Sequence, residues 1–280
     1  MGAVDKERVD VLLVQQGLFS SREQAKRAVM AGQILGENEE RLDKAGEKIP
    51  VTTALHFKGE RLKYVSRGGL KLEKALNDFD ITVQDKVVLD IGSSTGGFTD
   101  VALQNGSKLV YALDVGTNQL AWKLRSDDRV KVMENTNFRY SQLQDFKFGQ
   151  PEFATIDVSF ISLGLILPPL ANILQMGGHV VALIKPQFEA GRENVGKNGI
   201  IKDPKVHQQV LQKVTQMMVN DGFSVTELTY SPIKGGQGNI EFLAVLTRDD
   251  KPKIADKIDI DALLTQTYAQ LNHTGSNEHE

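Results

Sequence analysis

The sequence predicts an α/β protein with a small α+β unit at its N-terminus and a larger unit built on a mostly parallel sheet. After residue 67, short runs rich in Val, Ile and Leu alternate with helical patterns, which is typical of parallel strands that helices cover on both faces. The last two of these runs follow each other with no room for a helix between them. They therefore predict an antiparallel pair, and so one antiparallel edge strand in the sheet.

The first unit is expected over residues 1–63. Its first helix is predicted over 8–16, where apolar residues recur at helical spacing. The second predicted helix begins at the N-cap residues Ser20 and Ser21 and ends at Gly32. Short extended pieces are predicted at 33–35 and 48–52.

A linker is expected over 64–67, a second domain over 68–248 and a polar C-terminal tail over 249–280. The second domain opens with a helix predicted over 68–77. Its strands are predicted at 87–91, 109–113, 130–133, 153–156, 179–184, 225–230 and 242–246. Its other helices are predicted at 97–104, 118–124, 163–174 and 204–220. One more helix is predicted near 260–271, in the tail.

The composition excludes several classes of site. The 280 residues are 40% hydrophobic and 25% charged, as in an ordinary globular chain that can bury a sizeable core. There is no cysteine, which excludes a disulfide framework, a thiolate zinc site, an iron–sulfur cluster and a cysteine nucleophile. The five histidines form no His-x-x-x-His pair, so we expect no metal cofactor.

Nothing in the hydropathy pattern predicts membrane insertion. The longest mostly apolar run covers residues 163–176, and Pro168 and Pro169 interrupt it. It is too short to span a bilayer. The N-terminus lacks a basic region followed by an apolar run. We therefore expect a cytoplasmic protein.

The two parts of the chain differ in charge, although the net charge is only −3. Residues 1–74 hold 14 Lys and Arg against 11 Asp and Glu, whereas the remaining residues hold 19 against 25. Between Lys58 and Lys74, six basic residues stand against two Glu. A basic patch at a domain junction is typical of a phosphate-binding surface, and a solvated linker is the alternative that charge alone leaves open.

The strongest local pattern is an apolar strand, 87–91, that enters a glycine-rich turn, 92–97, and then a helix. This turn lies at the C-terminal edge of the predicted sheet, where doubly wound, Rossmann-like folds bind nucleotides. Glycines there let the backbone approach a ligand closely. Asp114 ends the next strand, 22 residues after Gly92, where a carboxylate can accept both hydroxyls of an adenosine ribose.

Three other templates can be weighed against this pattern. A dinucleotide fingerprint requires glycine where this chain has Ser94, and Asp90 suits a sulfonium better than a pyrophosphate, so S-adenosyl-L-methionine fits better than NAD. Residues 92–96 also match the nucleophile elbow of hydrolases, but that fold has several strands before the elbow, and here the strand opens its domain. Residues 191–197 resemble a P-loop, but Asn198 replaces the required Ser or Thr, and we interpret them as a surface loop.

Several motifs follow one another along the chain. They are RVDxLL from Arg8, SSRxxA from Ser20, YVSRGGLKL from Tyr64, DVSFIS from Asp157, KPQFE from Lys185, SPI from Ser231 and GNIE from Gly238. With these motifs in this order, roughly residues 5–247 resemble the TlyA (haemolysin A) family. In that family an S-four-type RNA-binding domain precedes an FtsJ-like 2′-O-methyltransferase. The resemblance implies a Rossmann-like S-adenosylmethionine-dependent methyltransferase with a small RNA-binding domain.

The resemblance implies a catalytic set of Lys71, Asp157, Lys185 and Glu241. Two of these positions are also informative by themselves, because Asp157 and Lys185 each end an apolar strand and so lie at the sheet edge that carries the glycine turn. A charged residue in such a place costs free energy unless it is paired. For either residue taken alone, a structural ion pair is the alternative.

The implied reaction is transfer of a methyl group from S-adenosyl-L-methionine to a ribose 2′-hydroxyl of ribosomal RNA, with cytidines as the implied targets. An alcohol is a weak nucleophile and needs a base or an orienting group. The sequence leaves open which of these Lys185 is; we expect it to contact the hydroxyl. The residues expected to hold the cofactor are Asp90, Gly92, Ser94, Gly96, Gly97, Asp114 and Asn135.

Basic side chains are expected to contact the RNA. Arg22 and Lys26 share one face of the second predicted helix, Arg8 begins the first, and Arg67 lies in the basic stretch at the junction. The expected partner is ribosomal RNA or a ribosomal subunit, with no membrane and no metal. The alternatives are a non-catalytic RNA- or ribosome-binding factor, a haemolysin-like membrane-active protein and a small-molecule methyltransferase.

Overall fold

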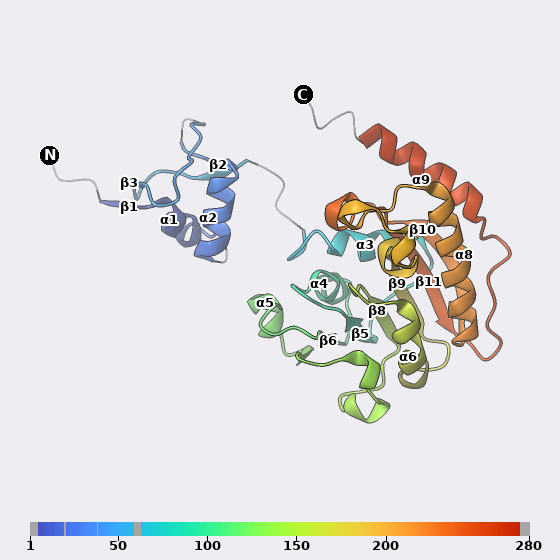
Figure 1. Cartoon of the computed structure of the whole chain (residues 1–280). Coiled ribbons are helices and arrows are strands. Elements are labelled where there is room, and N and C mark those ends of the chain that lie inside the picture. Colours follow the sequence, from blue (N-terminus) through green and yellow to red (C-terminus); the bar gives the residue numbers. More distant parts are fainter. Residues whose placement is uncertain (1–4, 20, 38, 59–62, 275–280) are drawn as a thin grey trace. The chain divides into compact units, whose positions relative to one another are not determined.

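The computed structural model of the chain describes residues 5–19, 21–37, 39–58 and 63–274 (Figure 1). The chain divides into two compact units, Met1–Lys63 and Tyr64–Glu280. Three parts of the sequence-based predictions lie outside the described residues: the N-cap residue Ser20, residues 59–62 of the basic stretch, and the last six residues of the tail.

The N-terminal unit packs two helices against two small antiparallel sheets. Its helices are α1 (Val9–Gln15) and α2 (Arg22–Met30). Its strands are β1 (Lys6–Arg8), paired with β3 (Lys48–Pro50), and β2 (Ile34–Leu35), paired with β4 (His56–Phe57). Ser21 is the N-cap of α2, and its side chain accepts a hydrogen bond from the Gln24 backbone N–H. The apolar stripes of the two helices supply most of a small buried core of this unit's own.

The second unit is built on a seven-stranded sheet in the order β10-β11-β9-β8-β5-β6-β7. The strands are β5 (Val87–Ile91), β6 (Leu109–Leu113), β7 (Val130–Met133), β8 (Phe153–Ile156), β9 (His179–Ile184), β10 (Phe223–Tyr230) and β11 (Phe242–Arg248). Strands β7, β6, β5, β8 and β9 are parallel. The prediction of a mostly parallel sheet with an antiparallel pair at one edge is confirmed. The reversed strand, β11, lies one place inside the edge, because the chain returns from β10 into the position beside β9.

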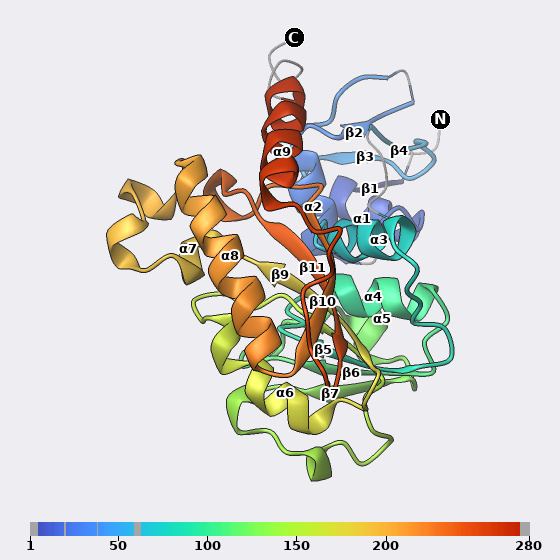
Figure 2. The same ribbon diagram turned by 90° about the vertical axis from the view of Figure 1, so that its right-hand side faces the viewer.

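Helices cover both faces of this sheet (Figure 2). One face carries α3 (Gly69–Asp78), α4 (Gly97–Gln104) and α5 (Trp122–Arg125). The other carries α6 (Leu167–Ile173), α8 (Pro204–Asn220) and α9 (Ile260–Thr274). Each face buries its own apolar cluster, which explains why the strands read as continuous apolar runs.

Two predicted helices are shorter than expected. The prediction over 118–124 is wrong at its start, because Asn118 has a φ of +56° and a left-handed residue cannot continue an α-helix. The helix predicted over 163–174 is shorter in the structure, where a 3₁₀ turn, Leu163–Leu165, precedes α6. Among the described residues, no helix combines the length and the apolar character that a bilayer crossing requires.

The strand order reverses at β5, and this brings the ends of several strands to one edge. The chain goes from β5 outward to β6 and β7, and then crosses back to β8 and β9 on the other side of β5. Parallel strands end at the same edge, so the segments after β5, β6, β8 and β9 gather there. Strand β11 starts at this edge, since Phe242 pairs with Ile184. The backbone register of β11 and β9 therefore places Glu241 and Lys185 next to each other.

The segment expected as a polar tail contains a helix that docks on the second unit. Leu263 and Leu264 of α9 are buried in the same apolar cluster as α8. His207 of α8 is fully buried against Phe242 and hydrogen-bonds the Tyr268 hydroxyl of α9 through Nδ1. Burial lowers the pKa of His207 to about 4, so the folded protein holds this ring neutral at physiological pH.

We predict that His207 makes the stability of the protein depend on pH. The folded pKa lies below the ordinary value of 6.5, so the unfolded chain binds more protons between these two pH values. The free energy of unfolding should therefore be fully supported above pH 6.5 and fall by roughly 2–3 kcal/mol as the pH drops to about 4. Urea unfolding of the wild type and of His207→Gln measures this. The variant should lack that part of the pH dependence, and identical pH profiles would refute the prediction.

Candidate active site

Four charged side chains form one continuous row at the carboxyl edge of the sheet. Lys71 Nζ on α3 lies 2.6 Å from Glu241 Oε2 and 3.6 Å from Asp157 Oδ2. Asp157 Oδ1 lies 2.5 Å from Lys185 Nζ. The order is Glu241, Lys71, Asp157, Lys185, so negative and positive groups alternate. The structure thus brings together all four residues that the sequence suggested as a catalytic set.

Most of this row is withdrawn from water. Lys71, Lys185 and Glu241 are 6%, 8% and 3% exposed, whereas the side chain of Asp157 is 22% exposed. Removing one member of a buried ion pair leaves an uncompensated charge, which costs several kcal/mol, about 3–5 in measured cases. Ion pairs with the neighbouring carboxylates therefore hold the two lysine side chains in place. Lys185 Nζ also donates a hydrogen bond to Ser159 Oγ at 3.1 Å.

The glycine-rich turn packs directly against this row. Gly92 has a φ of +85°, and a Cβ at this position would stand 2.5 Å from the backbone oxygen of Asp157. A Cβ at Gly97 would stand 2.9 Å from the backbone nitrogen of Gly69, at the start of α3. Gly96 has a φ of +100° and precedes α4 as its N-cap. Glycine is required at Gly92 and Gly97 because a second backbone segment approaches more closely than a side chain permits, and at Gly96 because of its positive φ.

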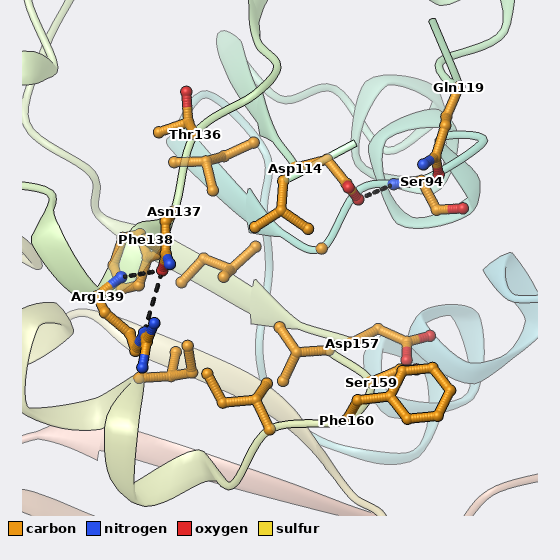
Figure 3. A pocket seen from close by; sticks show the side chains of 17 residues that line it. Ser94, Asp114, Gln119, Thr136, Asn137, Phe138, Arg139, Asp157, Ser159 and Phe160 are labelled. Carbon is orange, nitrogen blue, oxygen red and sulfur yellow. Dashed lines mark hydrogen bonds between the residues drawn. The ribbon is translucent and has the colours of Figure 1, made fainter. Parts of the chain in front are cut away.

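Two cavities adjoin this turn. The first has a volume of about 430 Å³ and lies against the ends of β5, β6 and β8 (Figure 3). The second has a volume of about 330 Å³, and its wall includes all four members of the charged row. Gly92, Ser94, Asp157 and Ser159 line both cavities. A ligand in the first cavity and a group in the second would therefore meet at these residues.

Asp114 presents its carboxylate to the first cavity, in the place expected from the sequence. Its Oδ2 accepts a hydrogen bond of 2.8 Å from the Ser94 backbone N–H (Figure 3). Its Oδ1 accepts one of 2.7 Å from the Gly116 backbone N–H. These two bonds fix the carboxylate and join it to the glycine-rich turn. Each oxygen keeps a further lone pair for a ligand hydroxyl.

Asp90 is held differently from the expectation of a carboxylate open to a sulfonium. It lies at the wall of the second cavity but is only 1% exposed, and its two oxygens accept hydrogen bonds from the hydroxyls of Thr99 and Thr155, at 2.7 and 2.8 Å. Burial raises the pKa of Asp90 to about 6. The threonines thus hold Asp90 against α4 and β8, in the wall of the second cavity.

Asn135 is the one expected cofactor residue besides Gly96 that lines neither of these two cavities. Its φ is +51°, and its backbone N–H is donated to the Gly116 carbonyl, so the chain turns there. The cavity wall instead contains Thr136, Asn137 and Phe138 (Figure 3). The loop after β7 thus lines the first cavity through the residues that follow Asn135, and Asn135 stays a predicted cofactor residue.

The N-terminal unit gathers two of the basic residues expected to contact RNA. Arg8 donates to both oxygens of Asp10, at 2.9 and 3.0 Å, and Arg22 donates to Asp10 Oδ2 at 3.1 Å. The Arg8 guanidinium lowers the pKa of Asp10 to about 2. Asp10 was not predicted as a functional residue, although it lies in the RVDxLL motif. Both arginine side chains stay about half exposed, and Lys26 and Arg67 are exposed as well.

The residues around the first cavity fit S-adenosyl-L-methionine. A fixed carboxylate faces the place for a ribose, a glycine turn admits a ligand against backbone, and the apolar side chains of Ile91, Leu113 and Phe138 can contact a base. Metal ligation has no comparable support, since within the described ranges no group of three or more His, Asp or Glu side chains has suitable geometry. Fold and site together define an S-adenosylmethionine-dependent methyltransferase of the Rossmann-like class.

Comparison with known proteins identifies the family. Residues 64–248 match the FtsJ-like methyltransferase family, and residues 7–48 match the S4 domain. A Bacillus subtilis protein, YqxC, described as a candidate rRNA methyltransferase, is 63% identical over 85% of this chain and 84% of its own length. The 16S/23S rRNA (cytidine-2′-O)-methyltransferase TlyA of Mycobacterium tuberculosis is 38% identical over 88% of this chain and 92% of its own. A solved structure from Streptococcus thermophilus, described as a candidate hemolysin, has a TM-score of 0.78 and 59% identity and covers 98% of this chain and 100% of that one. The chain belongs to the TlyA (haemolysin A) family of FtsJ-like methyltransferases.

We predict that Gly92→Ala damages the site beyond its cost in backbone strain. The added Cβ would collide with the Asp157 backbone and displace both the turn and the charged row. Gly106→Ala is the matched control, because Gly106 has a similar φ of +81° but its nearest neighbour is a side-chain atom of Gln84 at 3.5 Å. Both variants should lose about 1–3 kcal/mol of stability from strain. Only Gly92→Ala should also weaken S-adenosyl-L-methionine binding, by about tenfold or more in calorimetry. Equal affinities in the two variants would contradict the close-approach argument.

Proposed function

We propose that this protein methylates ribose 2′-hydroxyls of cytidines in ribosomal RNA, with Lys71, Asp157, Lys185 and Glu241 as its catalytic residues. The observation that carries the proposal is the row of alternating charges in the wall of the second cavity, which adjoins the first cavity at Asp157. A purely structural ion-pair network gains nothing from facing a cavity, whereas a site that orients a hydroxyl beside a methyl donor requires it.

The bound cofactor supplies an electrophilic methyl group on a sulfonium. The protein's own contribution is to bring the ribose oxygen into line with that group. As the oxygen–carbon bond forms, the carbon–sulfur bond breaks and the hydroxyl proton is released to solvent. Lys185 Nζ contacts the hydroxyl and sets its position, because it is held from two sides by Asp157 Oδ1 at 2.5 Å and Ser159 Oγ at 3.1 Å. Lys71 holds Asp157 in turn, and Glu241 pairs with Lys71. Alignment of this kind is worth about 7–11 kcal/mol in favourable cases.

The substrate proposal rests on the N-terminal unit and on the relatives. Arg8 and Arg22 are fixed in orientation by Asp10 and remain exposed enough to contact phosphates. A small-molecule methyltransferase would have no use for such a unit. The name of the Mycobacterium tuberculosis relative specifies 16S and 23S rRNA and the cytidine 2′-oxygen, and we extend that substrate to this chain. Ribosomal subunits are accordingly the proposed partners.

The proposal predicts that Lys185→Ala binds the cofactor and fails to transfer its methyl group. Lys185 lines only the second cavity, so calorimetry with S-adenosyl-L-methionine should give a dissociation constant within about threefold of the wild type. Methyl transfer to ribosomal subunits, measured with labelled cofactor, should fall by about 10²-fold or more. Lys257→Ala is a control that removes a lysine paired on the surface with Glu227, and it should keep full activity.

Mass mapping of ribose methylation in ribosomal RNA, before and after treatment with the protein, tests the substrate directly. Label at cytidine 2′-oxygens is the expected result. Label on a base, or on no RNA at all while the cofactor binds normally, would overturn the proposed reaction, and the second outcome would favour a non-catalytic RNA-binding factor. Full turnover by Lys185→Ala would remove this lysine from the mechanism.

A further inference from the structure

Two loops that carry catalytic candidates are joined by a carboxylate outside the charged row. Glu189 is the last residue of α7 (Pro186–Glu189), the short helix that follows Lys185. Its Oε2 accepts a hydrogen bond of 2.7 Å from the Ser162 hydroxyl, and its Oε1 accepts one of 2.8 Å from the Leu163 backbone N–H. Ser162 and Leu163 end the loop that starts at Asp157. Glu189 therefore connects the chain after Lys185 to the chain after Asp157.

Glu189 is a buried residue with hydrogen bonds to several parts of the fold, unlike a carboxylate on the surface. It is 5% exposed, and burial raises its pKa above the ordinary range. Its backbone oxygen accepts a hydrogen bond of 3.2 Å from Lys213 Nζ of α8. Burying a carboxylate costs free energy unless its oxygens accept hydrogen bonds. The two hydrogen bonds from the Asp157 loop offset this cost for Glu189.

The loop that Glu189 holds needs an anchor at its far end. At its near end, Asp157 follows β8 directly and donates its backbone N–H to Ile91 of β5. Between the anchors, Ser159 accepts the hydrogen bond from Lys185, and Phe160 has a φ of +63° and is 91% exposed. A non-glycine residue in the left-handed region persists only where the surroundings impose it. Glu189 supplies that constraint through Ser162 and Leu163.

A second buried side chain does the same for Glu241. Asn239 is 3% exposed and lies two residues before Glu241. Its Nδ2 donates to the Gly199 carbonyl at 2.9 Å, and its Oδ1 accepts from the Ile201 backbone N–H at 3.1 Å. Gly199 and Ile201 belong to the segment that continues from α7. Asn239 thus ties the Glu241 loop to the same stretch of chain that follows Lys185.

We propose that Glu189 and Asn239 are positioning residues, and that residues 186–201 form a clamp that holds Asp157 and Glu241 at their distances from the two lysines. The hydrogen bonds of Glu189 and Asn239 join the clamp to the loops that carry Asp157 and Glu241. The inference rests on the proposed function, because it assigns the clamp's effect to the methyl-transfer step. It gives a role to Ser162, Glu189 and Asn239, which lie in the DVSFIS, KPQFE and GNIE motifs and outside the row.

The clamp predicts a selective loss of turnover. In Glu189→Ala, the Asp157 loop loses both bonds at its far end, and kcat should fall by about 10²-fold, as expected for a displacement near 1 Å. The dissociation constant of S-adenosyl-L-methionine and the KM for ribosomal subunits should change by less than about threefold. Glu189→Gln should recover most of the wild-type kcat, because an amide oxygen can accept from Leu163 and the Ser162 hydroxyl can accept from the amide nitrogen.

At Asn239, unlike Glu189, we expect the conservative variant not to recover kcat. Asn239→Ala and Asn239→Asp should both lose kcat by about 10-fold or more, since a carboxylate has no donor for the Gly199 carbonyl. Ser162→Ala removes one bond of the clamp and leaves Glu189 itself in place; its kcat should fall by about three- to tenfold. Because Ser162→Ala removes only one hydrogen bond, it tests the clamp even if Glu189→Ala does not fold.

The matched control is Glu152→Ala. Glu152 Oε2 also accepts a backbone N–H, that of Val87 at 3.0 Å, but at the opposite edge of the sheet. This variant should lose thermal stability and keep its kcat. A kcat loss in Glu152→Ala as large as that in Glu189→Ala, or no recovery in Glu189→Gln, would overturn the clamp in favour of a general loss of stability. A fully active Glu189→Ala beside an inactive Lys185→Ala would refute the clamp alone, whereas a fully active Lys185→Ala would refute the proposed function.

Discussion

The site of this protein depends on charge compensation inside one short row of side chains. Both lysines of the row are buried beside a carboxylate, and burying an unpaired charge costs free energy. Asp157 serves both lysines and Glu241 completes the pairing of Lys71. Because the four residues come from α3, from the ends of β8 and β9 and from the start of β11, the row forms only when the whole carboxyl edge of the sheet is assembled correctly.

The close approach of two backbone segments connects this row to the cofactor cavity. Gly92 packs on the Asp157 peptide at a distance that leaves no room for a side chain. The donor side and the acceptor side of the proposed reaction therefore share one rigid wall, to which Ser94 and Ser159 also belong. A methyl transfer that relies on alignment benefits from such a wall, because the same residues position the methyl donor and the ribose oxygen.

Much of the fold is predictable because its signals are local and repeated. Strands buried on both faces must be apolar throughout, and glycine-rich turns mark where such strands meet a ligand. The helix predicted over 118–124 failed at its start because of the left-handed backbone of one residue, Asn118. The helix predicted over 163–174 begins instead as a 3₁₀ turn that precedes α6. Ser159 and Glu189 lie in motifs that are visible in the sequence, but their partners are distant in the chain or in another motif, so no spacing rule could assign them. Asp10 pairs with Arg8 of its own motif and with Arg22 of the next, and only the structure shows that one carboxylate serves both.

By itself, the sequence determined the order of strands and helices along the chain, the glycine turn at the end of β5 and the charged residues that end β8 and β9. These follow from periodicity and from the rarity of charge next to buried apolar runs. Only the tertiary structure decided that Lys71 and Glu241, 170 residues apart, meet at 2.6 Å, and that α9 docks on α8. The physical reason is that sheet register and helix packing depend on contacts between residues far apart in the chain, which no local pattern records.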